Sequence, residues 1–313
     1  MKSGVVWCVA VVVSGLLAPS PGVAQDESLS VAEQLQAAKK RVTQQEYLLR
    51  YKFRKGETVR WEVVHKARTD TKISGNSQTA ESNSVSTKVW SIDSVANDGN
   101  MRLVHSVDRL NMWQKIGNRK TVRYDSAKDQ APPPEYEAAA KTVGIPLSTV
   151  VITPTGRVVK TSRGRQPDLG LGQIVFPFPK KAVRIGASWN VPREVKVTVP
   201  EGGLRTFRKI KVRQQYTLQK VKSGIATIRV RTQVVTPVRD PKIESQLVQK
   251  LIKGTIKFDV DAGRVRTKNI EWDEQVIGFS GAGSNMSYRA RFTEKLLEKQ
   301  VKTAAKPTEK TAG

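Results

Sequence analysis

The sequence predicts a mainly β protein: antiparallel sheets from two tandem related units, of a curved or half-barrel type, with an N-terminal helix and one short helix in each unit. Three observations support this. Apolar and polar residues alternate over many segments, glycine-containing turns separate those segments, and features of residues 47–160 recur in the same order in residues 183–297. A parallel sheet is not expected, because its strands are apolar throughout and need helices between them.

The chain begins with an export signal over residues 1–24. Lys2 supplies the positive start, and the apolar run from Val5 to Leu17 is too short to span a bilayer. Small residues at 22–24 offer a cleavage site after residue 24. We therefore expect an exported protein, periplasmic or extracellular, with no transmembrane span after cleavage. The only cysteine, Cys8, lies inside the signal, so the mature chain would contain no disulfide.

An N-terminal helix is expected over residues 25–46, because Ser30 and Glu33 form a capping box. The first β unit, 47–160, follows with a period of two, as in Val59, Trp61 and Val63. Its short helix would begin at Pro134. Residues 69–88 are almost entirely polar, and the sequence leaves open whether they form a long hairpin or a mobile loop.

A connector over residues 161–182 joins the units, and we expect it to be ordered because Phe176 and Phe178 must pack somewhere. The second β unit spans 183–297. Its helix would start at Pro241 with Asp240 as N-cap. Residues 298–313 read as a disordered basic tail. Whether the two units share one sheet or form two domains is open at this point.

The proposed repeat depends on turns and strand ends. Gly56 to Trp61 matches Gly186 to Val191 in the order of glycine, hydroxyl residue and large apolar residue. Each unit also closes with Gly-Arg-Val, at 156–158 and at 263–265. A duplicated β unit predicts an architecture and not a chemistry.

The formal net charge is +26. Such an excess of Lys and Arg favours attraction to anionic surfaces. The basic residues are dispersed along polar strand faces, and no nucleic-acid-binding motif accompanies them. We therefore expect a lipid or an anionic envelope component as the partner, and not nucleic acid. The oligomeric state is not predicted.

No convergent catalytic set is visible, and no catalytic residue, metal site or cofactor is predicted. Ser280 stands in an incomplete nucleophile-elbow pattern, and no histidine follows it in the chain as an α/β-hydrolase requires. Asp259 and Asp261 precede Gly263, which is typical of a tight turn more than of a calcium loop.

Tryptophans and histidines on the alternating strands are the candidates for lining a ligand site. Core packing explains most of them as well, since buried aromatic and imidazole side chains usually serve the core. The candidates are Trp61, His65, Trp90, His105, Trp113 and Trp189.

Three runs carry a resemblance to a known family. They are residues 51–61 (YKFRKGETVRW), residues 89–101 (VWSIDSVANDGNM) and residues 152–159 (ITPTGRVV). They resemble an exported bacterial family known only as a domain of unknown function, over about 50–160 and more loosely over the rest. The resemblance implies a fold and no activity. The outline of a helix followed by many amphipathic strands is also similar, at the level of architecture, to periplasmic lipoprotein and lipid carriers.

These observations lead to one functional hypothesis and two alternatives. The hypothesis is an exported, non-enzymatic β-protein that binds an amphiphile or a cell-envelope component on an apolar sheet face. One alternative is a metal-free hydrolase of envelope polymers, which would need carboxylates or a serine–lysine pair brought together across the two units. The other is a structural or partner-binding module that pairs through an exposed strand edge.

Overall fold

The computed structural model describes residues 30–32, 34–36, 44–162, 175–201 and 204–298. The predicted signal (1–24), most of the basic tail (299–313) and part of the connector (163–174) lie outside the described residues. Of the predicted N-terminal helix, residues 31, 32, 34–36 and 44 are helical, and the Gln34 N–H donates to the Ser30 carbonyl over 2.9 Å.

Long strands make up most of the described chain, and its helices are short. The strands β1 and β8 pair with each other in a separate two-stranded sheet. Glu46, the last residue of the predicted N-terminal helix, is therefore extended, and the prediction was wrong at this end. The strands are β1 Glu46–Tyr47, β2 Thr58–Ile73, β3 Asn76–Val95, β4 Met101–Ile116, β5 Val122–Asp125, β6 Pro146–Ile152, β7 Val158–Ser162, β8 Val183–Arg184, β9 Ser188–Glu201, β10 Leu204–Lys222, β11 Ile225–Val234, β12 Lys253–Asp259, β13 Arg264–Ile277 and β14 Asn285–Leu297. The helices are η1 Pro134–Tyr136, α2 Glu137–Ala140, α3 Pro241–Leu247 and η2 Val248–Lys250.

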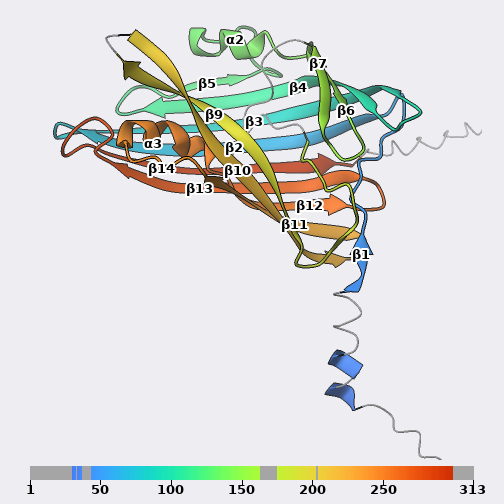
Figure 1. Ribbon diagram of the computed structural model, residues 1–313. Coiled ribbons are helices and arrows are strands. Elements are labelled where there is room, and N and C mark those ends of the chain that lie inside the picture. Colours follow the sequence, from blue (N-terminus) through green and yellow to red (C-terminus); the bar gives the residue numbers. More distant parts are fainter. Residues whose placement is uncertain (1–29, 33, 37–43, 163–174, 202–203, 299–313) are drawn as a thin grey trace, which may run out of the picture. The chain divides into compact units, whose positions relative to one another are not determined.

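The other strands form one 12-stranded sheet in the order β7-β6-β4-β3-β2-β14-β13-β12-β11-β10-β9, with β5 paired to β4. Neighbouring strands are antiparallel along the whole order. The sheet is open, with β7 and β9 at its edges, and Figure 1 shows β9, β10 and β11 running obliquely to β2, β3 and β4. The prediction of a mainly β, antiparallel fold with few short helices is confirmed.

The two halves of the sheet have the same internal order. In the first half the strands run β7-β6-β4-β3-β2, and in the second β13-β12-β11-β10-β9, with β14 between the halves. The halves therefore contribute to one continuous sheet, which answers the question that the sequence left open. The matching order agrees with a duplicated unit, but it does not establish one, and the repeat stays a prediction.

The polar segment 69–88 forms part of the β2–β3 hairpin, so the hairpin interpretation is correct. Ser74 and Gly75 turn the chain with φ values of 49° and 83°. Two consecutive residues with positive φ are typical of the tight turn whose twist suits an antiparallel hairpin. The pairing of β2 with β3 continues without a shift from Val64 and Val85 to Ile73 and Asn76, next to the turn.

Strand alternation gives the large sheet two different faces. The core face carries Trp61, Leu103 and Ile228, which are at most 1% exposed. The charged face carries residues such as Arg60 and Arg291, which alternate with the core-face residues along the same strands. This pattern is the one expected of an antiparallel sheet with one face buried.

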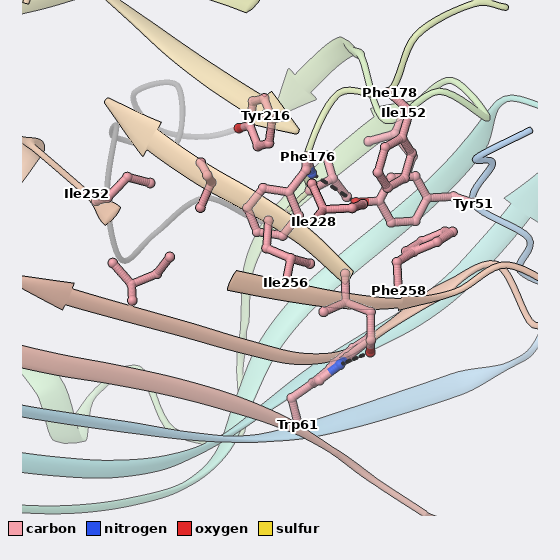
Figure 2. Close-up of a cluster of buried hydrophobic side chains, with 14 of the residues drawn as sticks. Tyr51, Trp61, Ile152, Phe176, Phe178, Tyr216, Ile228, Ile252, Ile256 and Phe258 are labelled. Carbon is pink, nitrogen blue, oxygen red and sulfur yellow. Dashed lines mark hydrogen bonds between the residues drawn. The ribbon is translucent and has the colours of Figure 1, made fainter. Parts of the chain in front are cut away.

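Two irregular segments, 49–53 and 175–178, cover part of the core face and complete its core. Tyr51 packs against Phe178 and Phe258, with ring centroids 5.2 and 5.5 Å away (Figure 2). The Phe176 N–H donates to the Tyr51 hydroxyl over 2.9 Å, which ties the two segments together. The Trp61 indole N–H donates to the Val265 carbonyl over 3.0 Å. We call the part of the core face that these two segments cover, with Trp61, Trp90 and Phe258, the packed end.

The two Gly-Arg-Val turns hold the segment 49–53 between them. The Tyr51 N–H donates to the Pro154 carbonyl, and the Lys52 N–H donates to the Gly263 carbonyl. Gly156 has φ of 77°, and a Cβ there would lie 2.3 Å from the Phe176 carbonyl oxygen. Glycine is required at this position both by the backbone conformation and by the lack of space.

Helix α3 packs against β9 and β10 near Val195 and Ile210. Asp240 caps it by accepting a hydrogen bond from the Lys242 N–H over 2.8 Å, as the sequence predicts. Ile243 and Leu247 point from the helix into a small second cluster. Its strand members are Val195, Val197, Ile210 and Val212.

Candidate ligand site on the core face

Three of the sequence candidates belong to the packed end or its border. Trp61 and Trp90 are 1% and 2% exposed, and their rings lie 4.7 Å apart. Trp189 stacks on Tyr216 at 5.6 Å and donates from its indole N–H to the Pro177 carbonyl over 2.9 Å. These contacts are those of core aromatic side chains, so core packing accounts for all three.

The two histidines lie on the core face but in different surroundings. His105 is opposite Trp90, and burial together with the Lys88 charge lowers its pKa to about 4. His65 is opposite Ser84, and burial lowers its pKa as well. Both imidazoles are therefore neutral at neutral pH. The ring of His65 meets the edge of Trp272 at 6.1 Å.

Trp113 lies on the charged face, away from the other candidates. A β-bulge accounts for this: Lys88 pairs with Val107 but Thr87 pairs with Arg109, so Asp108 is an extra residue. One extra residue reverses the alternation beyond it. His105 and Val107 thus face the core, whereas Trp113 stands beside Asn83 on the charged face.

Beyond the packed end, the core face carries small side chains that are only half buried. We call this part the open end and define it by Ala67, Ser82, Ser84 and Ala290. Ala290, Ala67 and Ser82 are consecutive members of one row across β14, β2 and β3. The side chains of the open end therefore extend only a short way from the sheet backbone.

The same row of core-face residues continues across the sheet into β13, β11 and β10. Its members on these strands are larger and carry polar atoms. Trp272 is opposite Ala290, and Gln214 is opposite Thr232. Trp272 Nε1, Thr232 Oγ1 and Gln214 Nε2 are all buried without a hydrogen-bond partner. Buried polar groups in folded proteins nearly always have partners, so such a row is a candidate place for a ligand.

Unpartnered buried polar atoms are concentrated on the core face. In the described part of the chain there are eight such side-chain atoms, and all but Asn83 Oδ1 belong to core-face residues. Most of these can only donate a hydrogen bond. The donor-only atoms are Trp90 Nε1, Arg193 Nε, Gln214 Nε2, Lys268 Nζ and Trp272 Nε1. A ligand that reaches any of them must therefore supply a hydrogen-bond acceptor.

A pocket of about 480 Å³, lined by both apolar and polar residues, lies further along the same strands. Val234 and Val276 border it from β11 and β13, and Leu247 and Val248 border it from α3 and η2. Glu274 also lines the pocket, and burial raises the pKa of its carboxyl group. The pocket can accept an apolar group next to the row of unpartnered donors.

A buried charge cluster on the core face was not predicted from the sequence. Lys88 and Glu294 form an ion pair, and Lys88 Nζ lies 4.9 Å from the centre of the Trp61 ring. Lys268 is opposite Glu294 in the register and is 2% exposed. A usable signal exists in the sequence: Lys88 is in phase with Trp90 and Ile92, and Lys268 with Ile270 and Trp272.

A second pocket, of about 650 Å³, is lined mostly by charged-face residues and also by Ala67, Ser82, Trp272 and Ala290. Trp113 and Asn83 border it, together with charged side chains that are largely paired with one another. Arg68 pairs with Glu81 at 3.0 Å, and Arg291 pairs with Glu271 at 3.1 Å. These exposed pairs are typical of a solvated sheet face.

Ser280, considered as a nucleophile, and Asp259, considered for a calcium loop, serve as turn residues. Asp259 accepts a hydrogen bond from the Ala262 N–H, and Ser280 lies in the β13–β14 turn, where its N–H donates to Ser284 Oγ. Among the described residues, no group of three or more His, Cys, Asp or Glu side chains could hold a metal ion. Nor does any helix in the described ranges have the length and apolar character needed to cross a membrane.

Residues 170–275 match a family described as a family of unknown function (DUF6263). The expected resemblance to an uncharacterised family is confirmed, although the match falls in the second half of the chain and not in residues 50–160. No curated protein matches the chain.

Two solved structures show remote similarity. Lipovitellin, from a study of its lipid–protein interactions, has 13% identity and a TM-score of 0.44; the match covers 79% of this chain and 26% of lipovitellin. A DUF1329 family protein from Desulfovibrio piger has 10% identity and a TM-score of 0.15, with 73% of this chain and 83% of that protein covered. This chain thus spans about a quarter of lipovitellin. Neither similarity is close enough to indicate what this chain binds.

Proposed function

We propose that this chain is an exported, non-enzymatic protein that binds an amphiphile on the core face of its sheet. One observation carries the proposal: buried polar atoms without partners occur on the same face as half-buried small side chains and a pocket that has Val234, Leu247, Val248 and Val276 in its lining. An amphiphile supplies both acceptor oxygens for the polar atoms and apolar surface for the valine and leucine side chains of the pocket.

Two features of the sequence support the remaining parts of the proposal. Residues 1–24 have the pattern of an export signal. The net charge of +26 favours a protein that works near anionic envelope surfaces. The charged face presents many of the basic groups, whereas the core face would hold the ligand.

Native mass spectrometry of the protein purified gently from an envelope extract tests the proposal directly. We expect an additional mass that is lost on denaturation and that fragments as a lipid or another amphiphile. A clean apo mass, together with no uptake of added long-chain amphiphiles in the same instrument, would overturn the proposal.

A matched pair of variants tests the location of the site. Ser84 and Val85 are neighbours on β3 and point to opposite faces. Ser84→Trp places a large ring over the open end, and we expect it to weaken amphiphile binding about tenfold or more. Val85→Trp adds the same ring to the charged face and should leave binding unchanged. Equal effects of the two variants would place the ligand elsewhere.

A further inference from the structure

Lys268 is the most unusual group on the core face. It is 2% exposed, and its Nζ makes no hydrogen bond. Its nearest aromatic neighbours are the rings of Phe292, at 4.6 Å, and Phe176, at 5.1 Å. The ring faces replace only part of the hydration that an ammonium group loses on burial.

The surrounding charges do not neutralise Lys268. Glu294 is the carboxylate on the neighbouring strand, but it forms its ion pair with Lys88. Two lysines therefore share one carboxylate, which leaves one positive charge in excess whenever both are protonated. Burial lowers the pKa of Lys268 to about 8, while the Glu294 charge acts in the opposite direction, so the ammonium form predominates at neutral pH.

We propose that the core-face ligand is an anionic amphiphile and that its head group binds Lys268. This inference rests on the proposed function and adds the charge of the ligand to it. A negative head would balance the excess charge and accept the hydrogen bonds that Lys268 Nζ lacks. From Lys268 the same face continues along β13 through Ile270, Trp272 and Glu274 to Val276, and the last two residues line the 480 Å³ pocket.

Carboxylate and phosphate heads share the required chemistry, and the test separates them. Binding of hexadecanoate, hexadecyl phosphate and methyl hexadecanoate to the purified protein is measured by titration calorimetry at pH 7. We expect at least one of the two anions to bind about tenfold or more tightly than the neutral ester. The stronger of the two anions identifies the head-group chemistry.

The variant Lys268→Met removes the charge and keeps the length and apolar stem of the side chain. We expect it to bind the ester as the natural protein does and to lose the preference for the anion. Lys295→Met is the control, because Lys295 is an exposed lysine on β14 that points to the charged face. It should keep the preference.

The pH dependence gives a test that needs no variant. The preference for the anion should fall as pH rises through about 8, because Lys268 then loses its proton. His65 and His105 have lowered pKa values and Tyr51 a raised one, so these groups do not titrate near pH 8. The titratable groups facing this region are Lys88, Glu294, His65, His105, Tyr51 and Tyr216.

Two results would overturn the inference while the proposed function stands: equal affinity for ester and anions, or an anion preference that survives Lys268→Met. If none of the three compounds binds, the proposed function itself fails, and this inference fails with it.

Discussion

The packed end and the open end of the core face are built on the same strands, yet they differ in what fills the space before the sheet. On β2 the packed end carries Trp61, which is 1% exposed, and the open end carries Ala67, which is half buried. On β3 the corresponding residues are Trp90 and Ser82. Large side chains therefore stabilise the packed end, whereas the open end, with its small side chains, is where we propose that part of the ligand lies.

The largest effect is expected from Trp61→Ala at the packed end. Removing this ring leaves a cavity against Trp90 and frees the Val265 carbonyl, so we expect a loss of about 4 kcal/mol in the free energy of unfolding. Urea denaturation measures it. The matched change at the open end, Ser84→Ala, should cost less than about 0.5 kcal/mol. Similar losses at both sites would break the comparison.

A glycine pair gives the next largest contrast. Gly156→Ala should destabilise the protein by about 3 kcal/mol, because φ is 77° and the new Cβ would collide with Phe176 and Tyr51 at the packed end. Gly75 has φ of 83° but nothing within 4 Å at its Cβ position. Gly75→Ala therefore carries only the backbone strain, about 1 kcal/mol. Thermal denaturation of the two variants should show this order, and the reverse order would contradict it.

Lys268 gives a pH-dependent contrast. Between its folded pKa of about 8 and its ordinary value of 10.5, the unfolded chain binds the proton and the folded chain does not. Stability therefore rises with pH in this window. From pH 8 to 10, the unfolding free energy of the natural protein should gain about 2 kcal/mol relative to Lys268→Met. Parallel pH profiles for the two proteins would show that this lysine keeps its ordinary pKa.

The smallest effect is expected from Asp70→Asn, on the charged face of β2. Asp70 accepts hydrogen bonds from Arg68, Thr79 and Arg289, and the Arg68 contact lowers its pKa to about 2. The site is open to solvent, so we expect a loss of only about 0.5 kcal/mol at neutral pH. Because the folded pKa is lowered, this difference should vanish as pH falls from about 4 towards 2. A loss above about 1.5 kcal/mol would mean that exposed pairs matter as much as the packed end.

The sequence predicted the strands well because most long strands alternate core-face and charged-face residues over much of their length. Its turn glycines, such as Gly99 and Gly263, do have positive φ, and Asp240 does cap a helix. The continuous sheet was not predictable, since β2 and β14 pair across almost the whole chain and no local pattern records that pairing.

The candidate site was predicted only in part. Trp113 is on the other face because a single extra residue at Asp108 reverses the alternation, and a bulge leaves little trace in the sequence. Lys268 was missed because a lysine usually marks a solvated position. Its place in phase with Ile270 and Trp272 was the available signal.

The pairing of β2 with β14 also has a consequence for how the chain folds. Arg289 and Asp70, which are in contact, are 219 positions apart in the chain. A chain that emerges N-terminus first cannot close this central seam until residues 285–297 are available. Until then the long edge of β2 is unpaired, and an unpaired edge invites association with other chains. With so many distant contacts, folding is expected to be slow, and protection of the nascent chain by a chaperone would matter more here than for a fold built from local contacts.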